Sequence, residues 1–99
     1  MIIYIAGPMS GLPDHNHPAF NEAEKALRRK GFIPLNPARR PHSQGTWESY
    51  LKKDIIDILT HAEGIALLPR WEISKGAKFE HFVSTTLGIP AKPLREWLA

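Results

Sequence analysis

Short apolar runs alternate with longer segments of helical periodicity along this chain of 99 residues. The expected strands are residues 2–6, 32–35, 64–68 and 91–94, and the expected helices are residues 18–30, 46–61 and 75–87. Strands and helices in alternation favour a parallel sheet with helices on both faces. The pattern therefore predicts an α/β fold with about four parallel strands, in which Pro34 places the second strand at an edge.

The length and composition exclude several classes of protein. A chain of this length has room for one domain, spanning residues 1–99. The absence of cysteine excludes a thiol nucleophile and an iron–sulfur cluster. No Walker or GxGxxG motif and no metal-ligand spacing occurs, so we expect neither cofactor nor metal. The one apolar run near the start is too short to span a bilayer and lacks a basic leader, so we expect a cytoplasmic protein without a membrane anchor.

The net charge of +3 is unevenly distributed. Between Lys25 and Lys53 there are eight basic residues and one acidic residue, Glu48. Arg39 and Arg40 lie within the expected loop at residues 36–45. Such a block can face a phosphate or nucleic acid, or it can be a solvated helix end followed by a basic loop. No aromatic side chain interleaves the two arginines, so the pattern does not indicate a stacking platform for single-stranded nucleic acid, and we do not expect nucleic acid as the main partner.

Two segments follow expected strands at the edge where open parallel sheets bind ligands. The first is Gly7-Pro8-Met9-Ser10-Gly11, whose glycines let the backbone approach a ligand and whose serine can bond a phosphate or sugar. The second begins with Arg70 and Trp71 and continues through Ser74 and Gly76. Ser74 stands at a helix N-cap, beside free N–H groups that suit an anion. We predict that these residues bind the substrate.

Two acidic residues stand close to the apolar stripes of their helices. Asp54 falls within the stripe that contains Trp47, Tyr50 and Ile58, where an unpaired carboxylate would cost several kcal/mol. It should therefore have a tyrosine, arginine or backbone N–H as partner, or a ligand. Glu80 flanks the stripe of the next helix, where it is either a surface residue or a partly desolvated nucleophile or base.

These motifs together resemble the nucleoside 2-deoxyribosyltransferase superfamily. The resemblance rests on Tyr4-Ile5-Ala6-Gly7-Pro8-Met9-Ser10-Gly11, the Asp54 helix and Ser74-x-Gly76-Ala77-x-x-Glu80, and it extends from Ile2 to about Pro93. Within the superfamily, the chain is most similar to the small members and to the deoxynucleoside 5'-monophosphate N-glycosidases. The resemblance implies a Rossmann-like, flavodoxin-like three-layer fold and attack on an N-glycosidic bond.

The resemblance also implies roles for individual residues. Glu80 would be the nucleophile that attacks the anomeric carbon, Asp54 would hold the substrate near its base, and Tyr4 would orient the nucleophile. At the position of Ser74 this chain resembles the monophosphate hydrolases, which carry a serine there, whereas the transferases carry an acidic residue. The substrate expected is therefore a nucleoside or, more specifically, a nucleoside 5'-monophosphate, with hydrolysis and transfer both open.

Two other interpretations remain at this stage. The chain could be a nucleotide-binding module of the same fold with weak catalysis, or the basic block could bind nucleic acid. Self-association is also expected. Ile56 faces away from its helix's apolar stripe, and a small chain with three tryptophans (Trp47, Trp71 and Trp97) can expose apolar surface that forms an interface. A homodimer or higher homo-oligomer would result.

Overall fold

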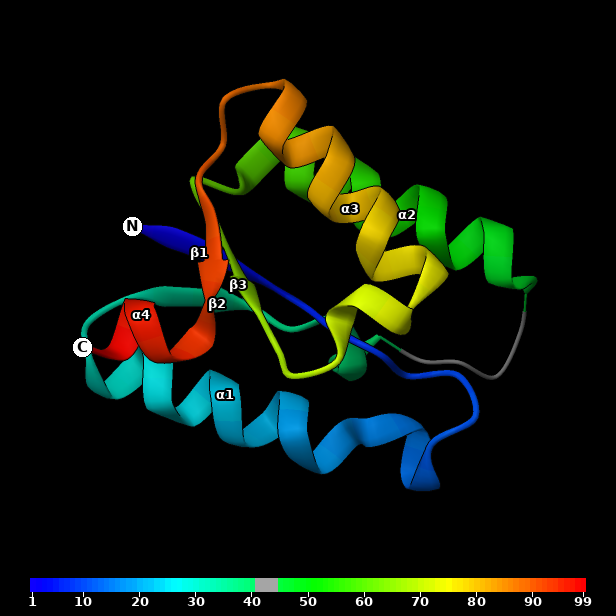
Figure 1. Cartoon of the computed structure of the whole chain (residues 1–99), viewed down its shortest axis with the longest axis horizontal. Coiled ribbons are helices and arrows are strands. Elements are labelled where there is room, and N and C mark those ends of the chain that lie inside the picture. Colours follow the sequence, from blue (N-terminus) through cyan, green and yellow to red (C-terminus); the bar gives the residue numbers. More distant parts are fainter. Residues whose placement is uncertain (41–44) are drawn as a thin grey trace.

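Four parallel strands form a sheet between two layers of helices (Figure 1). This computed structural model describes residues 1–40 and 45–99. The strands are β1 (Ile2–Ala6), β2 (Ile33–Leu35), β3 (Gly64–Leu67) and β4 (Ala91–Pro93). The helices are α1 (His17–Arg29), α2 (Trp47–His61), α3 (Lys75–Thr86) and α4 (Leu94–Leu98), with short 3₁₀ turns η1 (Pro13–Asn16), η2 (Pro37–Arg39) and η3 (Trp71–Ile73).

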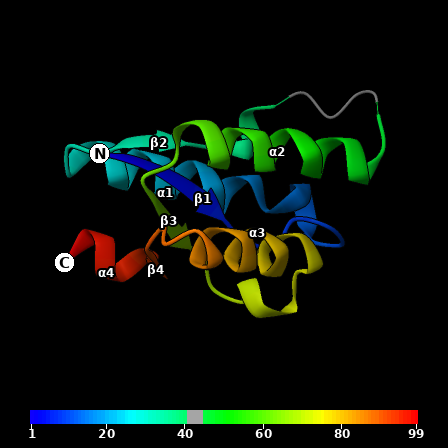
Figure 2. The same cartoon turned by 90° about the horizontal axis from the view of Figure 1, so that it is seen from above.

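The strand order is β2-β1-β3-β4, with every neighbouring pair parallel. The chain first crosses from β1 to β2 and then returns past β1 to β3, so the direction of winding reverses between β1 and β3 (Figure 2). The alternation predicted the parallel sheet with helices on both faces, and the resemblance implied the Rossmann-like three-layer arrangement; the structure confirms both. In such a fold the crevice at the carboxyl ends of the two strands flanking the reversal is the usual ligand site.

The central strand β1 supplies both cores because successive side chains point to opposite faces. Ile3 and Ile5 pack with α1 and α4 on one face, and Tyr4 and Ala6 pack with α2 and α3 on the other. All four side chains are buried. A strand covered on both faces reads as a continuous apolar run, which is why residues 2–6 were recognisable from sequence.

Local sequence signals define the ends of most elements. Thr46 forms a capping box with Ser49 at the start of α2, and the Ser74 hydroxyl accepts from the Ala77 N–H at the start of α3. β2 lies at the sheet edge, as Pro34 predicted. Within the predicted loop at 36–45, residues 37–39 form η2, and residues 41–44 lie outside the described part of the chain.

The end of the chain differs from the prediction. The run at 91–94 was expected to be all strand, but β4 ends at Pro93 and Leu94 begins α4. The Trp97 ring explains this, because it is buried against Phe32 and its N–H donates a 2.8 Å hydrogen bond to the carbonyl of Ile65. A five-residue helix is too short for periodicity to show.

Both ends of the chain lie at the amino-terminal edge of the sheet (Figures 1 and 2). The carboxyl ends of β1 and β3 point the opposite way, toward the start of α3. Within the described residues, no helix has the length and apolar character needed to cross a membrane.

Candidate active site

A cavity of about 300 Å³ opens at the carboxyl ends of β1 and β3, where the winding reverses. We call it the acid pocket, since Asp54 and Glu80 both line it. Its other lining residues are Tyr4, Ile5, Gly7, Met9, Ser10, His15, Phe20, Pro37, Trp47, Tyr50, Leu51, Ser74, Gly76 and Ala77. The pocket therefore draws on β1 and its loop, on α2 and on the first turns of α3.

Tyr4 and Glu80 form a buried pair within this pocket. The Tyr4 hydroxyl donates a 2.7 Å hydrogen bond to Oε2 of Glu80, and both side chains are almost fully buried. Burial raises the pKa of Glu80 to about 8, the Tyr4 hydrogen bond opposes this rise, and the charge of Asp54 adds to it. Burial and the two carboxylates raise the pKa of Tyr4 well above 10, so it remains a hydrogen-bond donor.

Asp54 has a charged partner, Arg40, which is one of the kinds of partner expected from its position in the stripe. Its Oδ1 lies 3.3 Å from Nη2 of Arg40, and its side chain is 17% exposed. Burial raises the pKa of Asp54 to about 6, and Arg40 opposes the rise. Asp57 is 39% exposed and shares the same Arg40 nitrogen at 2.5 Å. The pocket thus holds two carboxyl groups whose pKa values differ from each other and from ordinary values.

A second cavity of about 360 Å³ adjoins the acid pocket. We call it the side groove; Met9, Ser10, Trp47, Ser74 and Gly76 line both cavities. Its remaining lining residues are Pro8, Leu12, Ile73 and Lys75. The groove therefore combines two hydroxyls, a lysine and the amino-terminal end of a twelve-residue helix, which are groups that favour an anion.

Most of the predicted substrate-binding residues lie around these cavities. Tyr4, Gly7, Met9, Ser10, Asp54, Ser74, Gly76 and Glu80 line the acid pocket, and Pro8 lines the side groove. Gly11, Arg70 and Trp71 line neither cavity. Arg70 is exposed in a left-handed conformation. Trp71, the first residue of η3, packs against the core that contains Tyr4 and against the His81 ring, with 4.4 Å between the ring centroids.

Sequence reasoning missed several residues around the site. Trp47 and Tyr50 were predicted as core stripe residues, although their helical spacing to Asp54 already placed them on its face. Lys75 is the first residue of α3, and its Nζ lies 5.2 Å from the centre of the Trp47 ring. No local signal linked Arg40 to Asp54, because the two residues meet only through the tertiary fold.

Gly7, the residue that follows β1, is a glycine because the backbone there passes close to Leu68. A Cβ built on Gly7 would lie 2.8 Å from Cβ of Leu68, which is closer than real side chains come. Gly7 thus lets the loop after β1 pass directly over the end of β3. Within residues 1–40 and 45–99, no group of three acidic, histidine or cysteine side chains could hold a metal ion.

The fold and cavity define a Rossmann-like α/β protein with a buried two-carboxylate pocket at its topological switch point. The chain belongs to the family described as "Domain of unknown function (DUF4406)", whose sequence model matches residues 1–92. The match includes every residue that lines the two cavities. No curated protein matches the chain in sequence.

Proposed function

We propose that the protein cleaves the N-glycosidic bond of a nucleoside 5'-monophosphate, most simply a deoxynucleotide, with Glu80 as nucleophile. The observation that carries this proposal is the buried Tyr4–Glu80 pair in a pocket that also contains Asp54. Two carboxyl groups beside a sugar are the usual equipment for glycosidic cleavage. The resemblance to the nucleoside 2-deoxyribosyltransferase superfamily supports the same roles.

In the first step, Glu80 attacks the anomeric carbon as a carboxylate. A C–O bond forms, the C–N bond breaks, and its electron pair leaves with the base, which takes a proton from Asp54. In the second step, water attacks the same carbon, returns a proton to Asp54 and releases Glu80. The pKa of about 6 lets Asp54 hold or release a proton near neutrality, while Tyr4 stabilises the ionised form of Glu80.

The side groove supports a nucleotide over a nucleoside. A sugar bound at Glu80 could extend its 5'-phosphate past Ser10 and Ser74, toward Lys75. The Ser74 hydroxyl caps α3 and brings no negative charge, whereas a carboxylate at this position would repel a phosphate. Lys75→Gln should therefore reduce the preference for monophosphates over nucleosides, while Lys78→Gln, which alters an exposed lysine outside both cavities, should preserve it.

Release of free base from a panel of deoxynucleoside 5'-monophosphates, followed by chromatography, tests the proposal. We expect turnover by the wild-type chain and by Glu72→Gln, which removes an exposed carboxylate outside the pocket, and none by Glu80→Gln. Absence of base release at high protein concentration would refute the enzyme proposal. If a nucleotide then raises the melting temperature without being consumed, the pocket is a binding module.

We also propose that two copies associate through the outer face of α2 and α3. Ile56, Leu59, Phe79 and Phe82 on this face are each between 45% and 63% exposed. Together the four side chains expose apolar surface on the order of a few hundred Å², and patches of that size are often functional surfaces.

A second copy is the occupant that the charges favour. Glu48 and Lys52 lie one turn apart beside an apolar cavity of about 480 Å³ between the helices. In a two-fold contact, Glu48 of each copy can pair with Lys52 of the other. Sedimentation at two concentrations should reveal a dimer that Phe82→Glu dissociates and that Ile33→Glu, an exposed position on β2, leaves intact. A wild-type chain that sediments as a monomer at both concentrations would refute this surface.

A further inference from the structure

Arg39 and Arg40 are consecutive residues whose side chains reach opposite layers of the fold. Arg39 pairs with Glu24 on α1, which covers one face of the sheet. Arg40 pairs with Asp54 and Asp57 on α2, which covers the other face. The segment that follows β2 is therefore held from both sides, and part of the basic block seen in the sequence serves this purpose.

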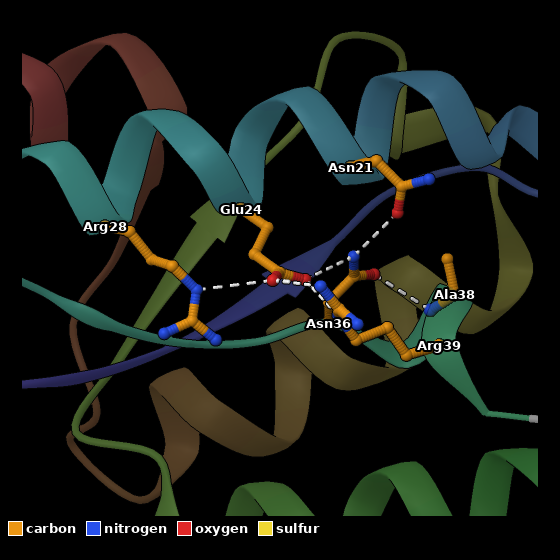
Figure 3. Close-up of polar contacts among 6 residues, drawn as sticks. All are labelled: Asn21, Glu24, Arg28, Asn36, Ala38 and Arg39. Atoms are coloured by element: carbon orange, nitrogen blue, oxygen red, sulfur yellow. Dashed lines mark hydrogen bonds and ion pairs between the residues drawn. The ribbon is translucent and has the colours of Figure 1, made fainter.

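Glu24 is the centre of the attachment on the α1 side (Figure 3). Its carboxylate accepts two 2.6 Å hydrogen bonds from Arg39, one at each oxygen, and further bonds from Asn36 at 3.0 Å and Arg28 at 3.3 Å. The Glu24 side chain is 6% exposed. A bidentate arginine pair on a buried carboxylate fixes geometry as well as charge, so η2 is anchored to α1 at its last residue.

Asn36 makes the same attachment more rigid. Its side-chain N–H₂ group donates to Glu24 and to Asn21, and its Oδ1 accepts from the backbone N–H of Ala38, which caps η2 (Figure 3). The segment immediately before Arg40 is thus bonded at several points to one helix through the side chains of Asn36 and Arg39. This leaves Arg40 little freedom in the direction from which it approaches α2.

On the α2 side, Arg40 lies behind Asp54 with respect to the acid pocket. Asp54 lines the pocket, whereas Arg40 does not. Oδ1 of Asp54 is buried and has no well-aligned hydrogen-bond partner within the described ranges 1–40 and 45–99. The nearby guanidinium is therefore the main charge that offsets the desolvation of this carboxylate.

We infer that Arg40 is a positioning residue that orients and charges Asp54 in the acid pocket, and that the Glu24–Arg39 pair holds Arg40 in place from the opposite face of the sheet. The inference rests on the proposed function for what Asp54 does to a substrate. It concerns the state of the carboxylate itself, which can be measured without any substrate.

Several charged or titratable groups face Asp54. They are Arg40 after η2, Asp57 on α2, Tyr4 on β1 and Glu80 on α3. Removal of the Arg40 charge leaves burial and Asp57, which raise the pKa of Asp54, opposed by the smaller lowering effect of Tyr4. Loss of the Glu24 carboxylate removes none of the groups that face Asp54 and loosens only the segment that carries Arg40. It should therefore also raise the pKa of Asp54, by a smaller amount.

Carboxyl ¹³C NMR titration of Asp54 in the free protein tests the inference. We expect Arg40→Met to raise the pKa of Asp54 by about one pH unit or more, Arg40→Lys to restore part of the wild-type value, and Glu24→Gln to give a smaller rise. The matched control is Glu22→Gln, which removes an exposed carboxylate on α1 that pairs with Lys25 and should change nothing.

Each outcome bears on a different part of the inference. An unchanged Asp54 titration in Arg40→Met would overturn the positioning role. A Glu24→Gln titration equal to that of Glu22→Gln would overturn the link through Arg39. If Arg40→Met does not fold, Arg40→Lys and Glu24→Gln decide the same two questions. Failure of the wild-type chain to release base from nucleotides would refute the proposed function and leave these titrations interpretable.

Discussion

The hydroxyl of Tyr4 on β1 donates a 2.7 Å hydrogen bond to Glu80 on α3, although 76 positions of sequence separate the two residues. Neither group can ionise freely, because both are buried. The bond favours the carboxylate of Glu80 over its protonated form, since an anionic acceptor binds a hydroxyl more strongly. Several properties of the protein depend on this pair.

The first prediction concerns the pH dependence of catalysis. If Glu80 must be ionised and Asp54 protonated in the same step, kcat/KM is bell-shaped against pH, with one midpoint near 6, the pKa of Asp54, and one near 8, the pKa of Glu80. Tyr4→Phe removes a hydrogen bond that lowers the pKa of Glu80, so the midpoint near 8 should move upward by roughly one pH unit. Thr85→Val removes an exposed hydroxyl on α3 that lies outside both cavities, and it should leave this midpoint unmoved. A midpoint that does not respond to Tyr4→Phe would contradict the assignment.

The second prediction concerns stability. The pKa of Glu80 is about 8 in the folded chain and near 4.5 when unfolded, so the folded state binds the extra proton between these values. Stability from this group is present below pH 4.5 and is lost as the pH rises through 8. Glu80→Gln should therefore raise the melting temperature at pH 8–9 by several degrees and leave it almost unchanged at pH 4. Calorimetry over this range checks the sign, and a larger gain at pH 4 would contradict it.

The third prediction concerns Glu24, whose pKa has the opposite shift. Hydrogen bonds from Arg39 lower the pKa of Glu24 to about 2, so it stabilises the fold above pH 4.5 and loses this effect as the pH falls through 2. Glu24→Gln should cost about 1–3 kcal/mol in the free energy of unfolding at pH 7 and progressively less below pH 4. Urea unfolding measures this loss, and Glu22→Gln should cost less than about 0.5 kcal/mol.

The fourth prediction concerns Gly64 at the start of β3. A Cβ at this position would lie 2.5 Å from the ring of Trp97 and 2.9 Å from Ile3. Gly64→Ala should cost about 1–3 kcal/mol, because Trp97 must leave its place in the core. Gly76→Ala, where the added methyl meets nothing closer than 3.6 Å, should instead stabilise α3 by up to about 1 kcal/mol. Equal melting temperatures for the two variants would contradict this difference.

Much of the fold could be predicted because its signals are local. The strand at 2–6, the caps at Thr46 and Ser74 and the edge position of Pro34 follow from apolar runs, hydroxyls and the missing proline N–H. These features need no knowledge of distant residues. The helix at Leu94–Leu98 could not be predicted in this way, because its formation depends on where the Trp97 ring packs.

The same distinction applies to the pocket. Asp54 could be identified because a charge within an apolar stripe needs a partner. The pattern left Glu80 as either a surface residue or a partly desolvated nucleophile, and only the resemblance implied the second. The partner of Asp54 could not be identified, since tyrosine, arginine and backbone all satisfy the same requirement. Which of thirteen basic residues reaches Asp54 depends on the path of the chain after β2.

The position of the chain ends has a practical consequence. Both termini lie at the edge of the sheet away from the acid pocket (Figure 1). An affinity tag, a fluorophore or a surface linker at either end would therefore leave the pocket mouth unobstructed. Immobilised protein can thus be titrated with nucleotides directly, and a fused reporter at one end can be exchanged for one at the other as a check that neither disturbs ligand entry.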